Sequence, residues 1–109
     1  MSVPIHAEPP PLRQDASGAV RIGDSRVLLE LVIRTFQDGA TPEAIAQRYP
    51  TTRLSDVYSV IGYYLRHREE IDAYLAERER LGDKIWERIQ QRQGDLGELR
   101  QRLLEQSEA

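Results

Sequence analysis

One short helix of this chain has both of its ends fixed by the sequence, and this limits how its neighbours can fold. Thr41 is a suitable N-cap because its hydroxyl can accept a hydrogen bond from a free backbone N–H, and Pro42 suits the first helical position. The helix must stop at Tyr49, because Pro50 disfavours helical geometry in the residue before it. A helix this short is not stable alone in water, so the sequence predicts that it packs against other elements.

A further helix is predicted on each side of the short one. The first spans Leu28–Asp38, and Gly39 follows it as a left-handed terminator. Its apolar face is formed at helical spacing by Leu29, Val32, Ile33 and Phe36. The second starts at Asp56 with Ser55 as its N-cap, and Gly62 within it predicts a close approach of another helix. Its buried stripe is formed by Val57, Val60, Ile61, Tyr64 and Leu65.

The residues before Leu28 predict an arm and short strands. Prolines recur in residues 1–11, and proline lacks the backbone donor that helices and central strands need, so we expect an extended or disordered arm. Turn signals at Asp15–Gly18 and Gly23–Ser25 flank a short strand at Ala19–Ile22. Two or three short strands are only marginally stable, so they need a helix or a second subunit to cover them.

Beyond His67 the sequence is charged and strongly helical, interrupted by Gly82, Gly94 and Gly97. We therefore expect a mainly α fold: a short N-terminal β-hairpin, a three-helix helix–turn–helix core and a C-terminal helical tail. The predicted division is a Pro-rich arm at 1–11, the hairpin and helix–turn–helix domain at 12–80, and a partner-binding tail at 81–109. Whether the helix from Asp56 continues unbroken past Arg68 stays open.

The composition argues against an enzyme and against a metal or cofactor site. The chain has no cysteine, and its two histidines, His6 and His67, have no second ligand at metal-binding spacing. The acidic residues Glu69, Glu70 and Asp72 have the pattern of a solvated helix face. No apolar run is long enough for a membrane span and no signal pattern opens the chain, so we expect a cytoplasmic protein without a small-molecule substrate.

The three predicted helices have the spacing of a helix–turn–helix, whose second helix enters the DNA major groove by its N-terminal end. The candidate DNA contacts are Arg53, Ser55, Tyr58 and Ser59. Asp56 would repel phosphate, and the net charge of -3 is spread evenly along the chain, which argues against a nonspecific polyanion binder. The alternative is an inert three-helix bundle in which Tyr58, Tyr63 and Tyr64 are core and rim aromatics.

The tail beyond Arg80 carries an apolar stripe. Heptads counted from Leu54 give a mostly apolar seam as far as Leu103, interrupted by Arg68, Arg78, Gly82 and Arg92. Trp86 lies just off this seam, as an interface anchor would. The candidate partner-binding residues are Leu81, Ile85, Trp86, Arg88, Ile89, Arg92, Leu96 and Leu99. Partner binding, self-association and a plain solvated helix are the three interpretations of this tail.

Several separate motifs, in order over roughly residues 11–80, resemble the VapB-like antitoxins, a family also known as domain of unknown function family 433. They are Gly18–Val27, Val32–Ile33, Gly39–Ala46, Tyr49–Pro50, Leu54–Tyr58 and Tyr63–Leu65. The resemblance implies a β-hairpin joined to a helix–turn–helix, a homodimer, and operator DNA as one partner. It also implies a cognate PIN-like ribonuclease toxin, which the antitoxin holds inactive.

A PIN-like active site is a cluster of acidic residues that bind magnesium. Arg88 and Arg92 flank Ile89 on the tail, and an arginine reaching into such a cluster would block it. Two other functions compete with the antitoxin: a stand-alone transcription regulator whose tail only dimerises it, and a protein–protein adaptor that never contacts nucleic acid.

Overall fold

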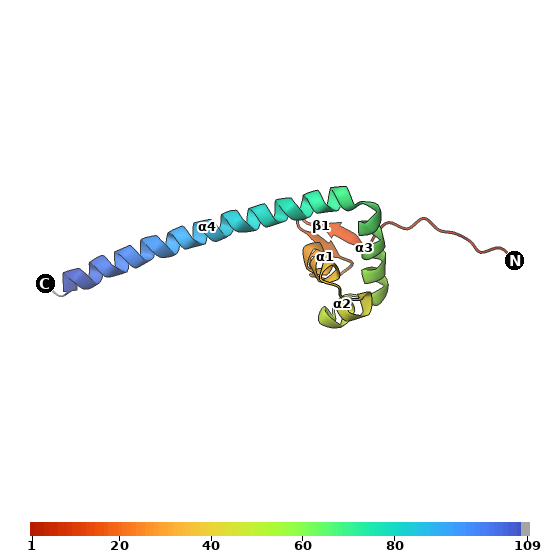
Figure 1. Cartoon of the computed structure of the whole chain (residues 1–109), viewed down its shortest axis with the longest axis horizontal. Helices are drawn as coiled ribbons and strands as arrows, with labels where there is room; N and C mark the ends of the chain where they lie inside the picture. The colour runs from red at the N-terminus through yellow and green to blue at the C-terminus, as the bar shows by residue number, and fades with distance from the viewer. Residues whose placement is uncertain (108–109) are drawn as a thin grey trace. The chain divides into compact units, whose positions relative to one another are not determined.

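The computed structural model describes residues 1–107 (Figure 1). The chain has two compact units, with the boundary after Asp72. Within the described residues the fold is mainly helical, with a two-stranded hairpin followed by four helices. The expected fold class is therefore confirmed. None of the described helices has the length and apolar character needed to cross a membrane.

The hairpin pairs β1 (Leu12–Gln14) with β2 (Val20–Ile22) in an antiparallel register that places Leu12 opposite Ile22. The predicted strand at Ala19–Ile22 corresponds to β2. Its partner, β1, follows directly on the proline arm, where the sequence has no strand signal of its own. Backbone bonds fix this entry, since the N–H of Leu12 donates to the carbonyl of Pro10 and the N–H of Gly23 donates to the carbonyl of Pro11.

Asp15 organises the turn between the two strands. Its Oδ1 accepts hydrogen bonds from the hydroxyl of Ser17 and from the backbone N–H groups of Ser17 and Ala19. Its Oδ2 lies 3.2 Å from Nε of Arg21. The bond from the Ser17 hydroxyl, with the others, lowers the pKa of the Asp15 carboxyl from 3.8 to about 2. Gly18 completes the turn at φ 89°, a conformation that glycine adopts without strain.

Three helices follow: α1 (Leu29–Gln37), α2 (Pro42–Arg48) and α3 (Leu54–Arg66). The first two lie within a residue of their predicted bounds. The predicted end of α1 and the predicted start of α2 are confirmed. Gly39 has a left-handed φ of 100°, and the Thr41 hydroxyl accepts a hydrogen bond of 3.2 Å from the backbone N–H of Ala44.

The predicted start of α3 was wrong. The helix begins at Leu54 with Arg53 as N-cap, and no side chain caps it. The turn closes earlier than expected because the N–H and the hydroxyl of Thr52 both donate to the carbonyl of Tyr49. The chain is therefore already helical at Ser55, which lies inside the first turn and is not the cap.

The core of the first unit is built from side chains of β2 and of all three short helices. Its largest fully buried side chains are Tyr64, Ile22, Ile33, Ile45, Val32, Val57 and Val60. The buried stripe predicted for α3 is confirmed except at Leu65, which is 51% exposed. Leu65 follows Tyr64 by about 100° around the helix, which turns it out of the core.

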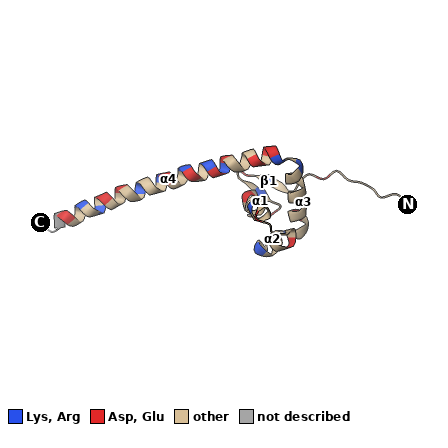
Figure 2. Ribbon diagram, viewed as in Figure 1, with Lys and Arg blue, Asp and Glu red and all other residues tan. Residues whose placement is uncertain are grey.

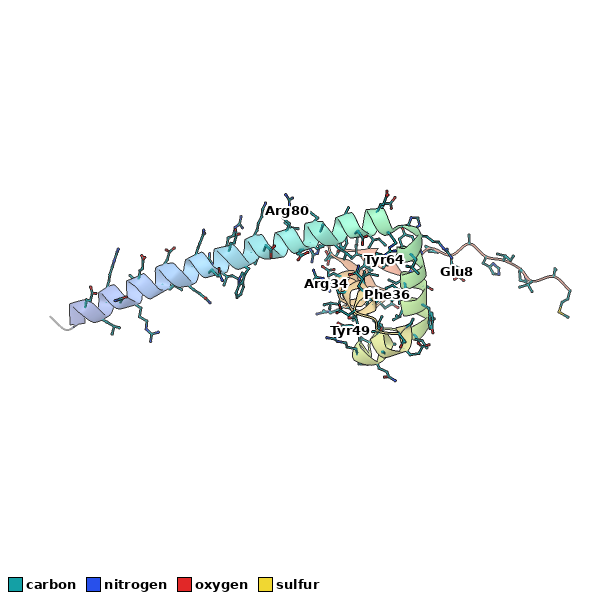
Figure 3. The ribbon with its side chains drawn as sticks, in the orientation of Figure 1. Glu8, Arg34, Phe36, Tyr49, Tyr64 and Arg80 are labelled. Carbon is teal, nitrogen blue, oxygen red and sulfur yellow. The ribbon has the colours of Figure 1, made fainter. Side chains whose placement is uncertain are left out.

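Tyr64 is the most connected side chain of this core. Its ring meets that of Phe36 edge to face, with the centroids 6.5 Å apart (Figure 3). Its hydroxyl accepts a hydrogen bond from Nε2 of Gln37 and donates one to Oδ1 of Asp72. The guanidinium of Arg68 lies 5.6 Å from the ring centroid. Tyr64 thus ties α1 and α3 to the residues that follow α3.

The helix from Leu54 does not continue unbroken, which answers the question that the sequence left open. It ends at Arg66, and α4 (Arg68–Ser107) begins after His67, whose φ and ψ are -129° and 40°. The His67 ring lies 4.2 Å from the ring of Tyr63. Ile71, one turn into α4, is buried.

From Arg68 the chain forms one helix of 40 residues. The predicted interruptions at Gly82, Gly94 and Gly97 were wrong. A single glycine costs a helix only about 1 kcal/mol relative to alanine, and its neighbours here are strong helix formers.

Candidate nucleic-acid and partner interfaces

The predicted DNA-contacting residues lie on one exposed part of the helix–turn–helix. Tyr58 and Ser59 lie three and four residues after Ser55 on α3, so both lie on the same side of the helix as Ser55, and Arg53 stands at its start. All four are exposed, Tyr58 by 50%. We call these four residues the α3 face. Its position at the N-terminal half of the second helix is the one that a DNA-reading helix requires.

Asp56 points away from the α3 face. A β-carbon built on Gly23 would lie 2.6 Å from Oδ2 of Asp56, so this carboxylate lies directly against the backbone of the turn after β2. Asp56 is half-buried there and lines a hollow together with Arg26 and Arg53. Its carboxylate therefore lies on the hairpin side of the helix, near Arg26 and near Arg53 of the α3 face.

Tyr58 contacts α2, because its hydroxyl donates a hydrogen bond to the carboxylate of Glu43. This hydrogen bond lowers the pKa of Glu43 and raises the pKa of Tyr58. The bond joins the two helices of the helix–turn–helix on their solvent side. It also brings a carboxylate to the edge of the α3 face.

The α3 face is polar and carries little charge. Figure 2 shows the ribbon of α3 largely free of charged residues between its two ends. Arg53 is the basic residue of the α3 face, and Arg66 lies outside that face at the end of α3; both are exposed. Serine hydroxyls and two arginines can contact phosphates, but they supply few of the ionic contacts that dominate DNA affinity.

The proline arm lies beside α3 from Tyr58 to Arg66, and so borders two residues of the α3 face. Glu8, Pro9 and Pro10 line one hollow with Tyr58, Ser59, Gly62, Tyr63 and Arg66. Figure 3 shows Glu8 on the arm beside α3. Gly62 has nothing within 4 Å of the position of a β-carbon, so the predicted close helix approach at Gly62 was wrong. The glycine instead forms the open floor of this hollow, which the sequence did not reveal.

In the second unit the predicted partner-binding residues are all exposed. The six apolar ones are between 39% and 61% exposed: Leu81, Ile85, Trp86, Ile89, Leu96 and Leu99. Arg88 and Arg92 join Ile85 and Ile89 in lining a shallow hollow along α4, together with Gln91 and Asp95. Asp95 was not predicted; its place one turn from Arg92 is the signal that would have found it. This side of the helix offers apolar and charged groups together.

Nothing in the described residues forms a metal-binding cluster of three or more acidic or histidine side chains. The model of a protein family described as "Protein of unknown function (DUF433)" matches residues 14–64. That range covers β2, α1, α2 and most of α3, and it stops before α4. No curated protein and no solved structure gives a significant match to the chain.

Proposed function

We propose that this protein is the antitoxin of a type II toxin–antitoxin module, of the VapB-like kind, acting through two separable surfaces. The observation that carries the proposal is the division of the chain. The helix–turn–helix is complete within the first unit, and an exposed amphipathic helix makes up the described part of the second. A chain of this design carries separate surfaces for DNA and for a protein.

Operator DNA is the proposed ligand of the α3 face. Arg53 donates to a guanine edge or a phosphate, and Ser55 and Ser59 donate to phosphates. The low charge of the face supports binding by a homodimer to a two-part site, since two copies double the few phosphate contacts.

A PIN-like ribonuclease toxin is the proposed ligand of α4 from Leu81 to Leu99. The apolar side chains of this stretch bury themselves in a groove of the toxin, with Trp86 as an anchor. Arg88 and Arg92 stand on the same side and reach toward the acidic residues that bind magnesium in the toxin. A guanidinium group then occupies the position of the magnesium ion, and the toxin is inactive.

The test is co-expression with the product of the neighbouring gene, with an affinity tag on this chain. We expect the full chain to capture that product and to suppress its ribonuclease activity. Substituting Ile85 and Ile89 with aspartate should abolish capture, whereas the matched control Glu87→Ala, on the opposite side of α4, should not. Arg88→Ala with Arg92→Ala should retain capture but release the nuclease activity.

The DNA half is tested separately, by a gel shift with the promoter region of the same operon. Arg53→Ala with Ser55→Ala should weaken binding about tenfold or more and reduce its salt dependence. Arg34→Ala, an exposed arginine on α1, is the matched control and should leave the shift unchanged. Capture without any DNA shift would indicate an adaptor, and a shift without capture would indicate a stand-alone regulator.

A further inference from the structure

The second unit has an apolar seam that nothing in that unit covers. Within its described residues the unit is a single helix, so its apolar side chains have no second element to pack against. The seam is formed at alternating spacings of four and three by Ile85, Ile89, Arg92, Leu96, Leu99 and Leu103. Its five apolar members are each at least 41% exposed. Spacings of this kind are those of a two-stranded coiled coil.

We propose that this seam pairs with the seam of a second copy of the chain in an antiparallel coiled coil, with Ile89 of each copy level with Arg92 of the other. In this register Ile85 lies opposite Leu96, and Gly82 lies opposite Leu99. The proposal goes beyond the function proposed above and does not depend on it, because it needs neither toxin nor DNA.

Arg92 decides the direction of the two helices. A parallel pair aligns each seam residue with its own copy, which would press two Arg92 guanidinium groups together in the seam. Burying like charges side by side is strongly unfavourable. In the antiparallel pair each Arg92 packs its aliphatic stem on an isoleucine and extends its charge outward to solvent.

The residues beside the seam decide the register. One flanking position of the heptad is occupied by Arg88, Asp95 and Arg102, each directly before a seam residue. In an antiparallel coiled coil, residues at this position of one helix lie next to residues at the same position of the other helix. The proposed register places Arg88 opposite Asp95, and the two-fold symmetry makes this pair occur twice. On the other flank Glu79 lies opposite Arg100, again twice. All four pairs join opposite charges.

The two neighbouring registers lack this complementarity. Sliding one helix by a heptad in one direction brings Arg88 opposite Arg88. Sliding it in the other direction brings Asp95 opposite Asp95 and Arg88 opposite Arg102. Like charges at such positions disfavour a pairing, so the charge pattern selects a single register.

The pairing has a consequence for the proposed toxin contact. Ile85, Ile89 and Arg92 belong to both surfaces, so the second copy and the toxin compete for one side of α4. The free protein keeps its apolar seam covered, and a partner must displace the second copy to bind there.

Cysteine cross-linking tests the proposal cleanly, because the chain contains no cysteine. The full chain carrying Ile85→Cys is mixed with the full chain carrying Leu96→Cys on a second tag and then oxidised. We expect a disulfide between the two different chains. Leu96→Cys alone should not cross-link, because its two copies lie 11 residues apart along the axis, about 16 Å. Glu87→Cys mixed with Glu98→Cys, on the opposite side of the helix, measures background collisions.

A disulfide in Leu96→Cys alone would show a parallel pair and overturn the proposal. The proposal would also be overturned if Ile85→Cys and Leu96→Cys cross-linked no more than the background pair Glu87→Cys and Glu98→Cys. A charge exchange gives an independent test by analytical ultracentrifugation. Arg88→Glu should weaken the dimer roughly threefold to tenfold, and adding Asp95→Arg should restore it. Failure of the double variant to recover would reject the proposed register.

Discussion

The two units of the chain derive their order from different sources. In residues 1–72 the elements are short, and each is held by the others, since β2, α1, α2 and α3 all contribute fully buried side chains to one core. From Ala73 onward the described chain is one long helix whose large apolar side chains from Leu81 to Leu104 are exposed. The first unit satisfies its apolar surface within itself, whereas the second presents a surface for another molecule.

This difference shows in how each helix is terminated. The short helices have defined ends, such as the Thr41 cap and the left-handed Gly39, because their lengths must fit the core. The long helix runs through three glycines without a break, because no packing requires it to stop. Termination signals therefore have their effect in the unit where tertiary contacts make use of them.

The largest expected effect contrasts one isoleucine in each unit. Ile45→Ala removes a fully buried side chain and should lower the free energy of unfolding by about 2–5 kcal/mol. Ile89→Ala truncates a side chain that is 41% exposed and should change the stability of the isolated chain by less than about 0.5 kcal/mol. Urea unfolding of both variants, at a concentration too low for self-association, makes the comparison. Equal losses would mean that the second unit has a core of its own.

The first unit was largely predictable because its signals are local. Helical spacing identified the core residues of α1 and α3, and the Thr41-Pro42 and Tyr49-Pro50 pairs bounded α2. The start of α3 was not predictable in this way. It depends on the hydroxyl of Thr52 closing the turn onto Tyr49, one of several bonds that a Thr-Thr pair can make.

The candidate interfaces were predictable as exposed residues but not in their surroundings. The bond from Tyr58 to Glu43 and the hollow beside the proline arm join residues far apart in sequence, and no periodicity encodes such contacts. The placement of Asp56 was not predictable for the same reason. Its direction is set by the close approach of Gly23, which the sequence shows only as a turn signal.

Glycine substitutions give the next largest effect and should have opposite signs in the two units. Gly23→Ala places a β-carbon 2.6 Å from Oδ2 of Asp56 at a backbone with φ 54°, so it should destabilise the first unit by roughly 1–3 kcal/mol. Gly82→Ala meets no atom within 4 Å and should stabilise α4 by up to about 1 kcal/mol. Thermal unfolding followed by circular dichroism measures both. Adding Asp56→Ala to Gly23→Ala should recover the part of the loss that is steric and leave the part that is due to φ.

The smallest expected effect concerns the pH dependence of the hairpin turn. The pKa of Asp15 is about 2 in the folded chain, below its ordinary value of 3.8. A lowered folded pKa means that the stabilising contribution of this carboxylate is complete above about pH 4 and is lost as the pH falls toward 2. NMR titration should place the Asp15 midpoint near 2 in the full chain. Ser17→Ala removes the hydroxyl that contributes most to the shift, so it should raise that midpoint toward 3.8. A midpoint for Asp15 that does not move in Ser17→Ala would show that the turn is held by the backbone and by Arg21 alone.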